Sequence, residues 1–131
     1  SVDTASVFIA DRLDIETPGA IQVNTLVNTL VAVSTVAGSV SVKEAGALTV
    51  SLISARNGDV TVETGGNLDV IAILSYGDSG NVLVNANGLL RIDRIETAIT
   101  AGALKTGGSI TIDATGTISE WLPTGATPEE V

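Results

Sequence analysis

The chain has 131 residues, a net charge of -9 and a composition that is 44% hydrophobic but only 2% aromatic. This length suits one domain with its own core, and the apolar content excludes a disordered chain. Cysteine and histidine are absent, which excludes disulfides, thiolate zinc sites and nucleophiles that depend on either residue, and the acidic balance disfavours nucleic-acid binding.

The composition predicts strands, and in the first third of the chain their spacing is irregular. Val, Ile and Thr supply 44 of the 131 residues, and β-branched side chains favour strands over helices. Residues 4–18 are expected to form a degenerate coil. The apolar stretch from Leu26 to Ala37 is interrupted by polar residues and is too short to cross a bilayer, so no membrane insertion is predicted. Leu30 lies eleven residues after Gly19, where the corresponding leucine of later repeats lies at ten, so we expect a bulge or an altered corner there.

A repeat organises the chain from residue 19 onward. Five segments open with a glycine followed by alternating apolar residues, and the openings recur after 19, 20, 22 and 28 residues: Gly19, Gly38, Gly58, Gly80 and Gly108. A second block begins eight residues after the opening glycine, at Gly46, Gly66, Gly88 and, imperfectly, Gly116. A third apolar position recurs at Ile53, Ile73 and Ile95. Each repeat therefore predicts three short strands separated by corners.

The spacing of these strands predicts an all-β solenoid. Apolar and polar residues alternate, as in Val60, Thr61 and Val62, which is typical of a strand with one buried face. A repeat of about 20 residues cannot bury that face alone, whereas stacked repeats form a continuous core. We therefore predict parallel sheets around a roughly triangular coil; a sandwich or barrel would not require corners in constant register. Residues 1–122 are expected to form this domain and residues 123–131 a linker or frayed tail.

The register also predicts which side chains stack. The expected core rows are Val40, Val60, Val82 and Ile110; Val42, Val62, Val84 and Ile112; and Leu48, Leu68, Leu90 and Ile118. Two outward columns follow: Asn24, Lys43, Glu63, Asn85 and Asp113; and Thr49, Asp69, Arg91 and Ser119. Lys43 with Glu63, and Asp69 with Arg91, are expected to be opposite charges on neighbouring coils. Corner pairs such as Asn57-Gly58 and Gly80-Asn81 are expected to supply the positive φ that tight bends need.

The last repeat contains an insertion from about Glu96 to Gly107. Loops on rigid scaffolds often carry binding. Ile99, Leu104 and Lys105 are therefore the candidate contacts for a ligand or partner. A tolerated insertion that folds its apolar residues back on the solenoid is the alternative.

The residues point to no enzyme, metal or cofactor. Polysaccharide lyases and hydrolases on β-helices cluster carboxylates on one sheet, whereas the columns here carry mixed charges, so no catalytic residue is predicted. The stretch Gly77-Asp78-Ser79-Gly80-Asn81 is faintly similar to calcium-binding β-rolls, but those need the motif in tandem and it occurs once. Thr49, Thr61 and Thr111 form no regular rank, which disfavours an ice-binding face.

The two repeated blocks, over about residues 19 to 120, resemble the repeat region of filamentous-haemagglutinin-like large exoproteins of bacteria. The resemblance implies a right-handed parallel β-helix, here of about six coils, within a secreted or surface-anchored protein that is often exported by the two-partner route. The secretion domain of that family carries Asn-Pro-Asn motifs, and no proline follows an asparagine here. The segment would thus correspond to shaft, and the resemblance supplies no catalytic residues.

The expected function is a non-catalytic stalk or fibre segment of a bacterial surface adhesin or secreted exoprotein, located outside the cell. Its expected partners are neighbouring coils or domains of a larger parent protein, because the chain contains no methionine and opens without a leader. A host or surface glycan or protein, bound by the insertion, is a further candidate partner. The alternative function is a carbohydrate-binding or polysaccharide-degrading β-helix module.

Overall fold

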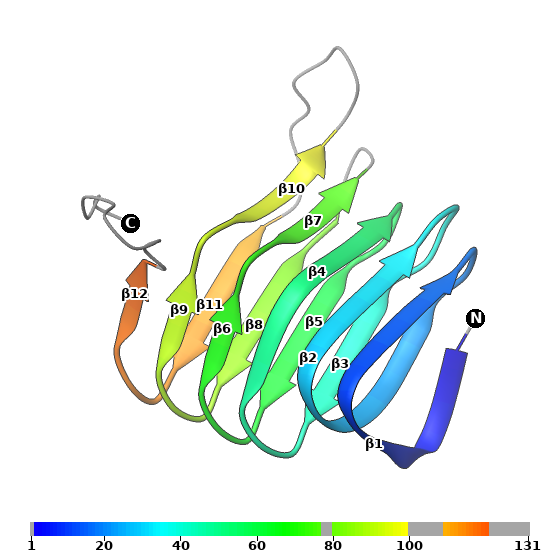
Figure 1. The fold of residues 1–131 in the computed structure, drawn as a ribbon. Coiled ribbons are helices and arrows are strands. Elements are labelled where there is room, and N and C mark those ends of the chain that lie inside the picture. Colours follow the sequence, from blue (N-terminus) through cyan, green and yellow to red (C-terminus); the bar gives the residue numbers. More distant parts are fainter. Residues whose placement is uncertain (1, 77–79, 100–108, 121–131) are drawn as a thin grey trace.

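Parallel strands stacked along one axis make up the molecule (Figure 1). The computed structural model describes residues 2–76, 80–99 and 109–120. The strands are β1 (Val2–Thr17), β2 (Ile21–Ser34), β3 (Val40–Glu44), β4 (Leu48–Arg56), β5 (Val60–Thr64), β6 (Leu68–Val70), β7 (Ile73–Tyr76), β8 (Val82–Ala86), β9 (Leu90–Ile92), β10 (Ile95–Ile99), β11 (Ile110–Ala114) and β12 (Ile118–Glu120). Every pairing between these strands is parallel.

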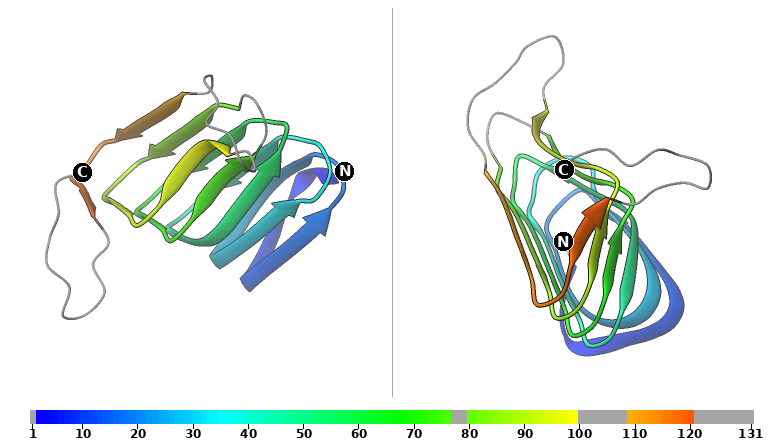
Figure 2. Two further views of the ribbon diagram at one scale, coloured as in Figure 1. Left: turned by 90° about the horizontal axis from the view of Figure 1, so that it is seen from above. Right: turned by 90° about the vertical axis from the view of Figure 1, so that its left-hand side faces the viewer.

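The strands form three faces around a common interior. One face runs β11-β8-β5-β3-β2, a second runs β2-β4-β6-β9-β12, and a third continues from the later parts of β2 and β4 through β7 to β10. Strand β4 is long enough to turn a corner and contributes to two faces, and the longer β2 contributes to all three. Viewed along the axis, the coils superimpose (Figure 2). The predicted parallel β-solenoid with coils of about 20 residues is confirmed, and the sandwich and barrel alternatives are wrong.

The predicted register is also confirmed. Val40, Val60, Val82 and Ile110 are successive partners, as are the members of the other two core rows. From Ile21 to Ile110 the chain makes roughly four turns. The total of about six coils and the right-handed sense stay predictions. The row members of the inner coils are almost fully buried, whereas in the last described coil Ile112 is partly buried and Ile110 and Ile118 are 43% and 44% exposed.

Glycine is required at the corners for a different reason from the one expected. Among the described residues, φ is positive only at Asn57 (53°) and at Gly38 (156°), so the prediction of positive φ at the other corners is wrong. Glycine is needed because the coils stack closely there. A Cβ on Gly58 would lie 2.6 Å from the carbonyl carbon and oxygen of Gly38, and a Cβ on Gly80 would lie 2.6 Å from the carbonyl oxygen of Gly58.

Polar corner residues join one coil to the next. The Ser39 hydroxyl accepts a hydrogen bond from the Asp59 N–H at 3.0 Å, the Asp59 carboxylate accepts one from the Asn81 N–H at 2.8 Å, and the Asn81 side-chain oxygen accepts one from the Ser109 N–H at 2.9 Å. Backbone donors at the bend are thereby satisfied without a regular strand partner. This ladder, rather than left-handed backbone, explains why short polar residues follow the corner glycines.

The bulge or altered corner expected at Leu30 is confirmed, because the register between β2 and β4 shifts between Leu30 and Val31. Leu30 pairs with Val50, not with Leu48, because this coil is one residue shorter between Thr25 and Leu30 than the next coil is between Glu44 and Val50. The register shift falls after Leu30, where β4 contains the extra residue Ser51. The equivalence of Leu30 with the leucine at the second block was therefore wrong.

Candidate ligand-binding groove

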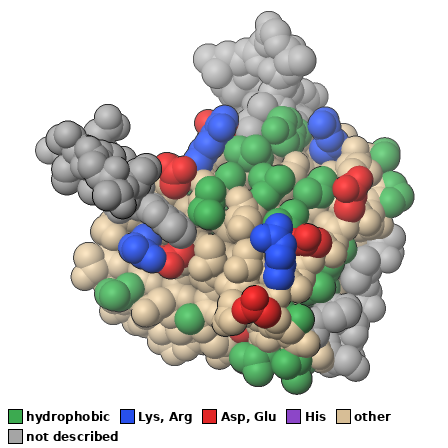
Figure 3. Space-filling view, in the orientation of Figure 1, with side chains coloured by type: hydrophobic (Ala, Val, Ile, Leu, Met, Phe, Trp, Pro, Cys, Tyr) green, Lys and Arg blue, Asp and Glu red, His purple; other side chains and the backbone are tan. Residues whose placement is uncertain are grey.

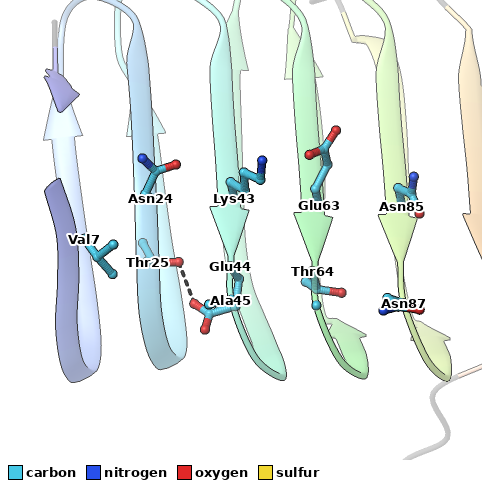
Figure 4. Close-up of a pocket in the computed structure, with 11 residues that line it drawn as sticks. Val7, Asn24, Thr25, Lys43, Glu44, Ala45, Glu63, Thr64, Asn85 and Asn87 are labelled. Atoms are coloured by element: carbon cyan, nitrogen blue, oxygen red, sulfur yellow. Dashed lines mark hydrogen bonds between the residues drawn. The ribbon is translucent and has the colours of Figure 1, made fainter. Parts of the chain in front are cut away.

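The first outward column is assembled as predicted. Asn24, Lys43, Glu63, Asn85 and Asp113 are successive register partners on β2, β3, β5, β8 and β11. Their positions alternate with inward valines, so the column faces solvent, and the first four side chains lie side by side (Figure 4). Strand spacing puts neighbouring members about 4.8 Å apart.

This column forms one wall of an open groove of about 610 Å³. The groove is lined by Val7, Asn24, Thr25, Lys43, Glu44, Ala45, Glu63, Thr64, Gly65, Asn85 and Asn87. Amide, ammonium and carboxylate groups follow one another along the wall, so donors and acceptors recur at the spacing of the coils. Such a surface can hydrogen-bond an elongated polar ligand.

The predicted neighbours Lys43 and Glu63 are partners in register. The structure does not bring their charges together, however: among the ion pairs of the described residues there is none between them. Both side chains are exposed, and at such positions the entropy lost in holding two long side chains in one geometry offsets most of their attraction in water. The expected ion pair is therefore absent, and both groups are available to a ligand.

Glu44 lies at the base of the groove and was not singled out from the sequence. Its side chain is on the inward side of β3, in a row with Thr25 and Thr64, and the residue is only 2% exposed. One carboxylate oxygen accepts hydrogen bonds from the Thr25 hydroxyl at 2.5 Å and the Val27 N–H at 3.1 Å, and the other accepts one from the Gly46 N–H at 3.1 Å. The segment from Thr25 to Leu30 is one residue shorter than its counterpart in the next coil, and these hydrogen bonds satisfy donors at that shortened corner.

The arrangement of Glu44 and Glu63 does not match that of a catalytic carboxyl pair. A general acid and base need two carboxyl groups free to exchange protons at the substrate. Glu44 is fully occupied by three donors from its own chain. The register neighbours of Glu63 are Lys43 and Asn85, which are not carboxylates.

The second outward column holds the other predicted pair. Arg91 donates from Nε to Asp69 Oδ1 at 2.6 Å and from Nη2 to Oδ2 at 2.5 Å, as expected from their neighbouring coils. The hydrogen bond to Asp69 and its charge raise the pKa of Arg91 above its ordinary value. This two-pronged contact ties adjacent coils together on a solvated face.

Most of the predicted insertion lies outside the described residues. Ile99 is the last residue of β10, where its backbone pairs with Tyr76. Leu104 and Lys105 lie outside the described residues, as do residues 77–79 of the calcium-like stretch and the tail 123–131. Ile99, Leu104 and Lys105 therefore stay predictions as contact residues.

The described ranges also contain no cluster of three or more acidic side chains that could hold a metal ion. Within the same ranges, no helix is long and apolar enough to span a membrane.

Comparison of the chain with protein-family models, with curated proteins and with solved structures finds no significant match. The repeats resemble those of filamentous-haemagglutinin-like exoproteins, and of what that resemblance implies the structure supports the β-solenoid fold alone.

Proposed function

We propose that the chain is a non-catalytic structural segment, a shaft, of a bacterial surface adhesin or secreted exoprotein. The observation that carries the proposal is the continuity of the coil-to-coil contacts. Core rows, corner hydrogen bonds and the Asp69–Arg91 pair all join one coil to the next. Such contacts give length and stiffness along one axis, which a stalk requires.

Neighbouring coils or domains of a larger parent protein are the proposed partners. Ile110 and Ile118 continue rows whose inner members are buried, yet they are 43% and 44% exposed. Apolar side chains in such rows are stabilised when a further coil stacks on them. A location outside the cell belongs to the same proposal, and it is supported only by the resemblance of the repeats.

Single-molecule stretching tests the shaft. We expect the chain, pulled from its two ends, to unfold in steps of one coil, which release about 70 Å each for 20 residues. One all-or-none step at low force would argue against stacked coils as independent load-bearing units. The same measurement on Asp69→Asn should lower the force of the steps without changing their length.

The second candidate function is carbohydrate binding, and the polar column along the groove favours it. Glycans present hydroxyl groups that both donate and accept, which matches the alternating amide, ammonium and carboxylate groups of the column. A panel of glycans, polysaccharides and matrix proteins separates the candidates. Saturable binding that is lost in Lys43→Gln with Glu63→Gln, but kept in Asp69→Asn, would assign the groove. Binding lost only when residues 97–107 are replaced by a short linker would assign the insertion, and no binding favours the shaft.

A further inference from the structure

Four neighbouring side chains of the first outward column have no partner within the chain. Asn24, Lys43, Glu63 and Asn85 make no side-chain hydrogen bond or ion pair in the described part of the structure. The polar groups of the corners, by contrast, hydrogen-bond from coil to coil. Figure 3 shows the second and third faces, where basic and acidic side chains lie side by side. The wall of the groove therefore presents a row of hydrogen-bonding groups that a ligand can use.

This column runs along the axis of the solenoid, across the strands. Its members are register partners, so they recur about every 4.8 Å, and they lie in one line across β2, β3, β5 and β8 (Figure 4). Val7 of β1 is the register partner of Asn24 and begins the column at the edge of the groove. A ligand that follows the axis meets one such side chain on every coil, whereas a ligand that follows a strand meets those of a single coil. The repeat therefore favours a polymer aligned with the axis.

The remainder of the groove surface is less polar than the column. Val7 and Ala45 contribute methyl groups, Gly65 contributes bare backbone, and all three residues are exposed. A sugar ring in its chair form carries hydroxyl groups around its edge and C–H groups on its two faces. Such a ring fits a site in which hydrogen-bonding groups stand on one wall beside an apolar surface.

The charges of the chain indicate an uncharged polymer. The net charge of -9 repels polyanions at long range. Lys43 can only donate hydrogen bonds and the Glu63 carboxylate can only accept them, whereas a hydroxyl group does both. Glu44, the other charged residue of the groove lining, is already bonded to its own chain. Sugar hydroxyls can therefore satisfy both Lys43 and Glu63 without bringing a like charge into the groove.

We propose that the groove binds one extended chain of an uncharged, cellulose-type polysaccharide, aligned with the solenoid axis and with one sugar ring over each coil. Equatorial linkages keep such a chain straight, and its rings recur at close to the spacing of the coils. The proposal rests on the carbohydrate-binding candidate described above, and it adds the class of glycan, its shape and its direction.

Isothermal titration calorimetry with cello-oligosaccharides of two to six rings tests the length dependence. The column from Val7 to Asn85 spans five coils. We expect the affinity to rise about two- to tenfold with each added ring up to roughly five rings, and then to level off. Malto-oligosaccharides of equal length are the matched ligands, because their axial linkages make the same glucose rings coil. We expect them to bind no more tightly than the two-ring cello-oligosaccharide.

The outcomes separate this proposal from carbohydrate binding in general. An affinity that does not depend on ring number, or that is equal for the two series, would overturn the proposal and leave carbohydrate binding in place. Binding of another glycan of the panel in the groove, without binding of the six-ring cello-oligosaccharide, would do the same. If no glycan of the panel binds, the carbohydrate candidate fails and the proposal fails with it.

A variant at the far end of the column tests whether each coil holds a ring. Asn85→Ala should weaken binding of the five-ring chain about two- to tenfold. It should leave the two-ring chain almost unaffected, because a short chain can occupy the other coils. Asn28→Ala is the matched control, since Asn28 is an exposed asparagine on β2 outside the groove, and it should change neither affinity. Equal effects of the two variants would overturn the proposal.

Nitrogen-15 NMR of the side-chain amides tests the direction of the chain. Gln22 and Asn24 lie on the same strand, two residues apart, whereas Asn85 lies three coils further along the column. The five-ring cello-oligosaccharide should shift the signals of both Asn24 and Asn85. Shifts of Gln22 and Asn24 without a shift of Asn85 would mean that the chain follows the strand, and would overturn the proposal.

Discussion

Replacement of Glu44 by alanine is the substitution whose cost follows most directly from the structure. The carboxylate accepts from the Thr25 hydroxyl at 2.5 Å, the Val27 N–H at 3.1 Å and the Gly46 N–H at 3.1 Å, at a residue only 2% exposed. A hydrogen bond to a charged group contributes about 1.5 to 3 kcal/mol, and a buried donor left without a partner costs about 1 to 3 kcal/mol.

The net cost is smaller than the sum of these bonds, because removing the carboxylate also removes the cost of burying its charge. We expect Glu44→Ala to lower the free energy of unfolding by about 2 to 4 kcal/mol. The free energy of unfolding of Glu44→Gln should lie between those of the natural chain and Glu44→Ala, since only the oxygen of an amide can accept hydrogen bonds.

Urea unfolding at constant salt, followed by far-ultraviolet circular dichroism, measures this difference. Glu63→Ala is the control, since the same side chain is removed one coil further on from an exposed outward position. It should change the free energy of unfolding by less than about 0.5 kcal/mol. Equal effects of the two substitutions would refute the assignment of Glu44 as the group that completes the shorter coil.

Three further predictions concern the corners, the surface pairs and the core. Gly58→Ala should destabilise the fold by about 1 to 3 kcal/mol in a urea melt, because the added Cβ would lie 2.6 Å from the Gly38 backbone, whereas Gly46→Ala, whose nearest neighbour would lie at 3.6 Å, should be tolerated. The hydrogen bond from Arg94 lowers the pKa of Glu96, so Arg94→Gln should raise that pKa in a carbon-13 NMR titration; the small stability that the pair contributes is present above the ordinary pKa of the carboxyl group and is lost as the pH falls through the lowered value. Val62→Asp places an unpaired charge at a fully buried position and should abolish the native β signal; a variant with an unchanged melting temperature would contradict the register.

Most of the fold could be predicted because corner glycines mark the register of each repeat. Once Gly38, Gly58 and Gly80 are aligned, the partners of Val40 and Val42 follow by counting, and the structure confirms them. The same counting produced the column from Asn24 to Asp113. It failed at Leu30, where the coil is one residue short and Glu44 takes the place of the missing backbone.

Two features of the molecule were not predicted from the sequence and became apparent only in the structure. Its charge assigns a glutamate to the solvent side, whereas the alternation along β3 places Glu44 in the inward row between Thr25 and Thr64. The outward positions of Leu52 and Leu74 were missed because the sequences Leu52-Ile53 and Ile73-Leu74 have no alternation of apolar and polar residues to orient them. Lys43 and Glu63 illustrate a third limit, since register places two residues side by side without making their charged ends meet.

The parallel, in-register stack is the central claim, because both the shaft and the groove depend on it. Nuclear Overhauser contacts of the Val62 backbone protons test it most directly. We expect contacts with both Val42 and Val84, which lie 20 and 22 residues away in the sequence, in the pattern of parallel strands. Contacts of β3 with β4 in an antiparallel hairpin would contradict the account.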